Sequence, residues 1–151
     1  MQNNLFKSAL HYELKNEMEM PEVDWVAPDE FPDLRSCDYI AIDLETCDPN
    51  LLTKGPGWVR KDGFIVGVAI AAGDFTGYYP IKHEGGGNIS GNLVKRWLKD
   101  QLATPHIPKI MHNALYDLGW LRSANIPIQG QIIDTMIAAP LIDENRFSYS
   151  L

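Results

Sequence analysis

The sequence predicts an α/β fold in which helices flank a mixed β-sheet. Two observations carry this prediction. Three short apolar, β-prone runs come first, at residues 39–43, 64–71 and 75–81, and strands then alternate with helical patterns between residues 90 and 142. An initial meander followed by such alternation is typical of a sheet with both antiparallel and parallel neighbours. A length of 151 residues with 45% hydrophobic content suits one domain with its own core.

The sequence divides into an acidic, proline-containing arm, residues 1–36, and a domain, residues 37–151. The arm holds three basic and eight acidic residues and therefore most of the net charge of −7. Its prolines favour extended or turn backbone over a regular helix. Four apolar side chains are expected to pin the arm to the domain: Trp25, Val26, Phe31 and Leu34.

The first half of the domain is predicted to be a meander. The first strand covers residues 39–42 and ends at Asp43, and a loop rich in Pro and Gly leads to the second strand, 64–71. Gly73-Asp74 between two apolar runs is typical of a hairpin turn, and the third strand is 75–81.

The second half alternates helices and strands. Ser90 can cap a helix over residues 91–102, on which four apolar residues share a face, namely Leu93, Val94, Trp97 and Leu98. The following elements are a strand at 109–112, a helix at 113–123, a strand at 131–133 and a helix at 135–142.

The cysteine content and the hydropathy of the chain indicate its cellular compartment. Cys37 and Cys47 flank the first strand and are expected to be free thiols, because one pair is a poor basis for a disulfide framework. No apolar run approaches the roughly 20 residues of a membrane span, and the first residues lack a secretory apolar region. We therefore expect a cytoplasmic protein without a membrane partner.

Two acids follow the first strand. Asp43 and Glu45 are two residues apart, so period-two geometry puts their side chains on one face, where both can bind one cation. Such a pair also arises by chance and can be a solvated strand end. Acids at the carboxyl end of an apolar strand nevertheless lie where open α/β sheets place their sites.

A second polar pair opens the helix at 113–123. Asn113 and Asp117 are four residues apart and lie on one face, one turn apart. Asn113 is also a good N-cap residue, and both interpretations can hold. Asp117 is surrounded by apolar neighbours, and an acid there needs solvent or a cation. Beside Asp43 and Glu45, we favour the cation.

Three segments in this order resemble the 3′-5′ exonuclease domain of family A (Pol I-type) DNA polymerases, especially phage ones. They are DLET (43–46), HNALYDLGWL (112–121) and IIDTMIAA (132–139). The resemblance covers about residues 25–151. It implies a DEDD exonuclease with a ribonuclease H-like fold.

The resemblance implies catalytic, metal-binding roles for Asp43, Glu45 and Asp117, which would hold two divalent cations. Asp43 would bridge both ions, Glu45 would bind the ion that activates the attacking water, and Asp117 would position the second ion. Oxygen ligands suit Mg²⁺ or Mn²⁺ better than zinc. Asp134 matches an acid that is no metal ligand, so we expect it to cap the following helix.

Five further residues are expected to contact single-stranded DNA. By the resemblance, Thr46, His112 and Asn113 line the pocket for the 3′-terminal nucleotide. Trp58 and Arg60, in a loop with two lysines, combine base stacking with phosphate pairing. A solvated loop with one anchored Trp is the alternative explanation of that loop.

The third motif of the family, an aromatic residue followed four positions later by Asp, is missing from residues 143–151, so we expect it beyond Leu151. With three acids, we expect weaker metal binding and little hydrolysis by this chain alone. The predicted function is 3′-5′ hydrolysis of single-stranded or frayed DNA as part of a DNA polymerase. One alternative is a non-catalytic DNA-binding fragment, or half of a split polymerase completed by a downstream polypeptide. An RNA 3′-trimming exonuclease is the other.

Overall fold

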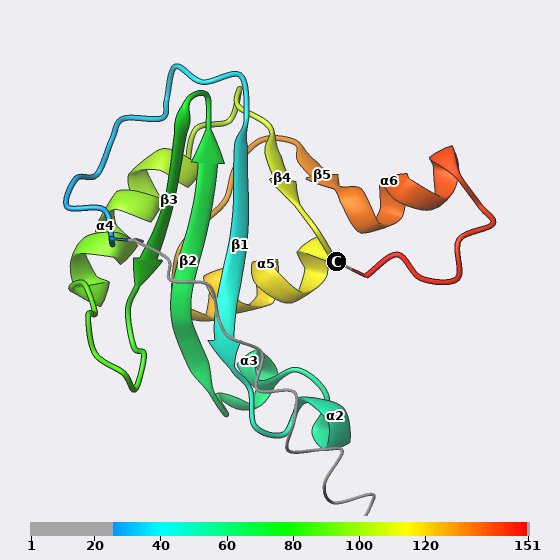
Figure 1. The fold of residues 1–151 in the computed structure, drawn as a ribbon, viewed down its shortest axis with the longest axis horizontal. Helices are drawn as coiled ribbons and strands as arrows, with labels where there is room; N and C mark the ends of the chain where they lie inside the picture. Colours follow the sequence, from blue (N-terminus) through cyan, green and yellow to red (C-terminus); the bar gives the residue numbers. More distant parts are fainter. Residues whose placement is uncertain (1–25, 151) are drawn as a thin grey trace, which may run out of the picture.

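The computed structural model describes residues 26–150, which form a five-stranded sheet in the order β3-β2-β1-β4-β5 (Figure 1). In chain order the elements are β1 (Ile40–Cys47), α2 (Leu51–Lys54), α3 (Gly57–Arg60), β2 (Phe64–Ala72), β3 (Phe75–Pro80), α4 (Gly91–Leu102), β4 (Lys109–Met111), α5 (Ala114–Ser123), β5 (Ile132–Asp134) and α6 (Thr135–Ile142). β2 is antiparallel to β1 and β3, whereas β1, β4 and β5 are parallel. The predicted mixed sheet is confirmed.

One face of the sheet carries the hydrophobic core. On β1, Ile40, Ile42 and Leu44 point into this face and are buried. α4 and α5 pack on it, and Figure 1 shows both helices on the same side of the sheet. Their buried side chains include Val94, Trp97, Leu98, Trp120 and Leu121. Among the elements of residues 26–150, no helix covers the opposite face, which we call the open face.

The end of the arm packs on the domain. Leu34 is buried, and the ring of Phe31 stacks on that of Tyr79 with centroids 5.3 Å apart. The prediction that Phe31 and Leu34 pin the arm is thus confirmed. For Val26 it is wrong, because Val26 precedes the segment that reaches the core and is 81% exposed. Trp25 lies outside the described residues.

Two short helices occupy the stretch predicted to be a loop. The carboxylate of Asp48 accepts a hydrogen bond from the amide of Gly57, the first residue of α3, at 2.8 Å. The guanidinium of Arg60 donates to the carbonyls of Lys54 and Gly55 at 2.5 and 2.9 Å, where α2 ends. Hydrogen bonds from side chains to the backbone support these four-residue helices. The sequence shows no hydrophobic periodicity there, so the helices could not be predicted from it.

α4 has the predicted bounds but differs in two details. Ser90 precedes its first turn, yet the Ser90 side chain makes no capping hydrogen bond. Leu93 is 42% exposed, whereas Val94, Trp97 and Leu98 are buried. Those three follow the spacing of one helix face, and Leu93 is turned about 100° away from Val94, so its assignment to that face was wrong.

The remaining boundaries agree with prediction to within a residue, except at the end of β1. Cys37 and Cys47 are free thiols, as predicted. Within residues 26–150, every helix is too short or too polar to cross a membrane.

Candidate active site

The candidate site lies where β1 continues past the end of β4. β1 pairs with β4 only over its first two residues but stays paired with β2 as far as Cys47. The amide of Leu44, in this extended part, donates to Oδ1 of Asp117 at 3.2 Å. α5 therefore takes the place of a neighbouring strand and brings Asp117 directly against β1.

Asp43 and Glu45 lie on the open face, with Leu44 buried between them. The predicted period-two arrangement of the two acids is confirmed. They lie within β1 and not at its end, so the predicted boundary was wrong. The strand continues because β2 keeps pairing with it, through a register shift between Glu45 and Thr46. Such a bulge re-aims side chains beside a site.

Asp117 is a buried acid beside another acid. Asp117 is only 3% exposed. Burial, and after it the negative charge of Asp43, raises the pKa of Asp117 to about 7. A buried carboxylate whose charged neighbour has the same sign is unfavourable by itself and fits a cation between the two groups.

Asp134 organises the entry to α5 and α6. Its Oδ1 accepts the amides of Asn113 and Met136 at 3.0 and 2.9 Å, and its Oδ2 accepts the amide of Ala114 at 2.8 Å. The prediction that Asp134 caps the following helix is confirmed, and it caps α5 as well. Asn113 stands at the N-terminus of α5 with a left-handed φ of 59°, but its side chain makes no capping bond. The side-chain cap considered for Asn113 is therefore wrong, because Asp134 takes that role.

His112 follows the end of β4, where its ring contacts Thr135. Thr135 donates its hydroxyl proton to the carbonyl of Met111 at 3.2 Å, so the Nδ1 of His112, 2.9 Å from the same hydroxyl oxygen, is assigned as the donor to it. Nε2 of His112 is buried and has no hydrogen-bond partner among the described residues.

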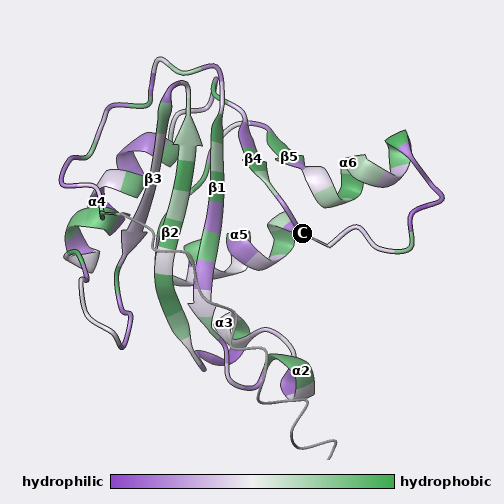
Figure 2. Cartoon of the chain, in the orientation of Figure 1, coloured by the Kyte–Doolittle hydropathy of each residue, from purple (hydrophilic) through white to green (hydrophobic). Residues whose placement is uncertain are grey.

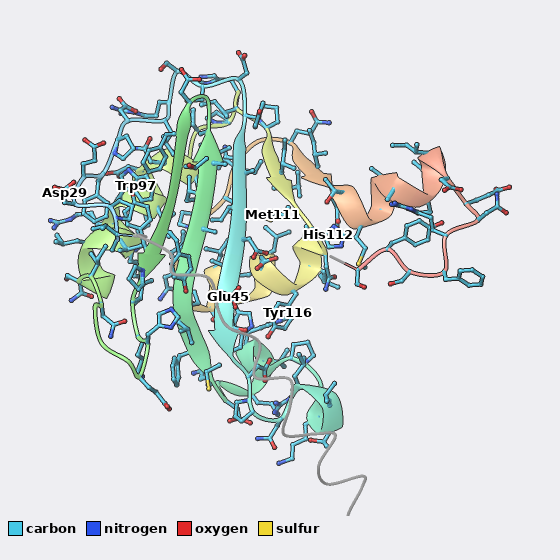
Figure 3. All side chains as sticks on the ribbon, viewed as in Figure 1. Asp29, Glu45, Trp97, Met111, His112 and Tyr116 are labelled. Carbon is cyan, nitrogen blue, oxygen red and sulfur yellow. The ribbon has the colours of Figure 1, made fainter. Side chains whose placement is uncertain are left out.

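Thr46 and the loop that carries α2 and α3 are joined to α5 by Tyr116. The Tyr116 hydroxyl lies 2.9 Å from Oγ1 of Thr46 and donates to Oδ2 of Asp48 at 3.1 Å. Figure 3 shows Glu45, Tyr116 and His112 around the region where β1 and β4 separate. Sequence reasoning missed Tyr116 and Asp48. Tyr116 precedes Asp117 in the sequence, but only the fold brings it to Asp48.

Trp58 and Arg60 make internal contacts. The indole of Trp58 packs so closely on Gly119 of α5 that a Cβ there would lie 2.2 Å from Cε2 of the ring. Arg60 holds the turn between α2 and α3, as described above. The structure does not place either residue among the carboxylates, and their role in binding a strand stays a prediction.

The donor set fits a divalent cation in its chemistry. The predicted ligands are all carboxylates, and hard oxygen donors suit Mg²⁺ or Mn²⁺. Asp43 and Asp117 interact, and Glu45 shares the face of Asp43. In residues 26–150, however, no three Asp, Glu, His or Cys side chains are gathered closely enough to form a ready-made ion site. Mutual repulsion of the carboxylates favours such separation when no cation offsets it.

Comparisons with known proteins agree with this architecture. A family profile described as 3′-5′ exonuclease matches residues 28–151. A DNA-directed DNA polymerase of Pseudomonas phage M6 is 39% identical over 134 residues, which are 85% of this chain and 20% of that protein. DNA polymerase I of Chloroflexus aurantiacus is 35% identical over 83 residues, 54% of this chain and 9% of that protein. The chain thus spans a small part of these curated relatives.

The solved structure of Brucella melitensis NrnC with bound Mg²⁺ superposes with a TM-score of 0.55 at 26% identity, over 83% of this chain and 55% of that one. The predicted ribonuclease H-like α/β fold is confirmed by this likeness and by the strand order. The family match extends over nearly all of the described residues and includes every element of the candidate site. The chain therefore belongs to the 3′-5′ exonuclease family found in family A DNA polymerases, a family of nucleases.

Proposed function

We propose that this chain is the metal-binding part of a proofreading exonuclease that removes nucleotides from the 3′ end of single-stranded or frayed DNA. The observation that carries the proposal is the burial of Asp117 beside Asp43, in a chain whose family match covers both residues. The phage and bacterial relatives support action in the cytoplasm of a bacterium or a phage-infected host.

Asp43, Glu45 and Asp117 hold two divalent cations, Mg²⁺ or Mn²⁺. The Mg²⁺ bound to NrnC supports the choice of metal. When bound, such ions relieve charge on the phosphate and supply hydroxide at neutral pH. Asp117 would bind an ion as a carboxylate, and its pKa of about 7 places the loss of its proton near physiological pH. The hydrogen bond from the Leu44 amide keeps its carboxylate turned toward β1.

The 3′-terminal nucleotide lies against Thr46, His112 and Asn113. The loop that Trp58 and Arg60 hold in shape extends this surface toward the preceding nucleotides.

A second candidate function follows from the apolar surface that the described residues leave uncovered. α6 has no buried residue, and Figure 2 shows it as predominantly hydrophobic. Its exposed side chains and one just after it are Met136, Ile137, Leu141, Ile142 and Phe147. The open face contains a hollow of about 590 Å³, lined by apolar residues such as Ala41, Ala69 and Ile110 and also by Asp43 and His112 of the candidate site. We propose that a downstream polypeptide of the polymerase packs on the exposed apolar side chains of α6 and over this hollow. That polypeptide would supply the Asp of the family's third motif. The isolated chain then binds DNA with little hydrolysis.

One assay tests both functions. A 3′-labelled single strand is incubated with Mn²⁺ and the chain, alone or with the segment of the Pseudomonas phage M6 polymerase that follows its match to this chain. We expect little release of mononucleotides from the chain alone and release with the added segment, reduced to background by Asp43→Ala.

Three other outcomes are informative. Brisk, Asp43-dependent release by the chain alone refutes the need for a downstream polypeptide. No release under either condition, with DNA still bound, contradicts the exonuclease and favours a binding fragment. Faster release from an RNA strand at the same salt favours RNA trimming.

A further inference from the structure

The open face carries a hydroxyl group beside Glu45 that the sequence did not reveal. Glu45 on β1 pairs directly with Gly67 on β2, so the side chains of this pair would face each other on the open face. Gly67 has none. A Cβ placed there would lie 1.9 Å from the hydroxyl oxygen of Tyr78, which reaches over from β3. The Tyr78 hydroxyl therefore occupies the position of the side chain opposite Glu45.

His83 fixes the Tyr78 hydroxyl from its other side. Nε2 of His83 lies 2.5 Å from the hydroxyl oxygen, and the two rings meet edge to face with centroids 5.7 Å apart. The backbone of His83 is itself held by Asn88, whose side chain bonds both its amide and its carbonyl, at 2.7 and 2.9 Å. The phenol is thus oriented by the loop that follows β3.

Electrostatics agree with this placement. Burial, and after it the negative charge of Glu45, raises the pKa of Tyr78. A hydroxyl has one hydrogen to donate and two lone pairs, so Tyr78 can accept a hydrogen bond from the Nε2–H of His83 while it donates one to a carboxylate.

We propose that Tyr78 is a positioning residue that orients the carboxylate of Glu45 toward the cation, and that His83 fixes Tyr78 for this purpose. The inference rests on the proposed metal-binding function. It assigns a role to a pair of residues outside the three carboxylates. Partners of this kind, which do not touch the metal, set the direction and affinity of its ligands.

The first test needs no metal. A double-mutant cycle with Tyr78→Phe and Glu45→Gln is measured by urea unfolding at pH 8 in the presence of a chelator. We expect the two substitutions to be non-additive by about fivefold in the unfolding constant. Strict additivity would show that hydroxyl and carboxylate do not interact, and would overturn the proposal.

The second test measures Mn²⁺ affinity by calorimetry. We expect Tyr78→Phe to weaken binding about tenfold, and His83→Phe to weaken it in the same direction. Tyr79→Phe is the matched control: this neighbouring tyrosine points to the opposite face, where its hydroxyl donates to the carbonyl of Glu30 at 2.9 Å. The Tyr79→Phe variant loses one hydrogen bond but leaves the surroundings of Glu45 unchanged, so its Mn²⁺ affinity should equal that of the wild type.

The outcomes separate this proposal from the proposed function. If wild type binds Mn²⁺ and Tyr78→Phe binds it equally well, the positioning role is wrong and the metal site stands. If wild type binds no Mn²⁺, the metal-binding function is contradicted, and the positioning of Glu45 for a cation is overturned with it.

Discussion

Asp117→Asn is expected to make the metal-free protein more stable than the wild type at pH 8, by on the order of 2 kcal/mol. Asn has nearly the same shape as Asp and keeps an oxygen that can accept the hydrogen bond from the Leu44 amide, which Asp117 now accepts at 3.2 Å. What it removes is a buried negative charge beside Asp43. Few substitutions at a proposed metal ligand are expected to stabilise a protein, so the direction of the effect is informative.

The pH dependence follows from the raised pKa of Asp117. Burial and the charge of Asp43 bring it to about 7 in the folded protein, against an ordinary value of 3.8. Between these two values the unfolded chain has lost a proton that the folded protein keeps, so wild-type stability falls as the pH rises through this window. Below about pH 4 both states are protonated and the penalty vanishes.

Urea unfolding of wild type and Asp117→Asn at pH 4, 6 and 8, with a chelator present, measures this difference. The advantage of the variant should be largest at pH 8 and close to zero at pH 4. Asp74→Asn is the control, because it removes one acidic side chain from the exposed β2–β3 turn. A variant less stable than wild type at pH 8 would show that Asp117 is well accommodated without a cation.

Asp134→Ala is expected to destabilise the protein by about 3 kcal/mol, because three backbone amides lose their acceptor at once. The amides belong to Asn113, Ala114 and Met136, at the first turns of α5 and α6. The loss also removes the group that holds the entry to α5, one turn before Asp117.

An intermediate variant and the pH provide the controls. Asp134→Asn keeps one acceptor oxygen but turns an amide group toward the Ala114 N–H. We therefore expect it to lose about half as much stability as Asp134→Ala. Partial burial raises the pKa of Asp134, but the amide hydrogen bonds from Ala114, Met136 and Asn113 outweigh it and lower the pKa overall. Its contribution is therefore complete above the ordinary pKa and decreases as the pH falls through the lowered value. If Asp134→Ala unfolds at the wild-type urea concentration, the double cap contributes nothing.

Local patterns predicted the architecture because this domain follows them closely. The apolar runs of β2 and β3 are bounded by Gly73-Asp74, and the buried positions of α4 repeat at helical spacing. The alternation along β1 correctly placed Asp43 and Glu45 together on one face. Each of these inferences needs only neighbouring residues.

The features that sequence reasoning missed depend on distant parts of the chain. β1 extends to Cys47 because β2 pairs with it, and the loop after it folds because Asp48 reaches Gly57. Asp134 caps α5 as well as α6 because β5 lies beside β4. The hydroxyl beside Glu45 arises from the absence of a side chain at Gly67, which has meaning only once the strand register is known.

A Mn²⁺ titration by calorimetry at pH 7.5 tests the central claim most directly, namely that Asp43, Glu45 and Asp117 together bind divalent cations. We expect wild type to bind Mn²⁺, Asp43→Asn and Asp117→Asn to bind it at least about tenfold more weakly, and Asp74→Asn to bind it like wild type. Because Asp117→Asn is expected to be stably folded, its loss of binding cannot be attributed to unfolding. Equal affinity of wild type, Asp43→Asn and Asp117→Asn would contradict the account.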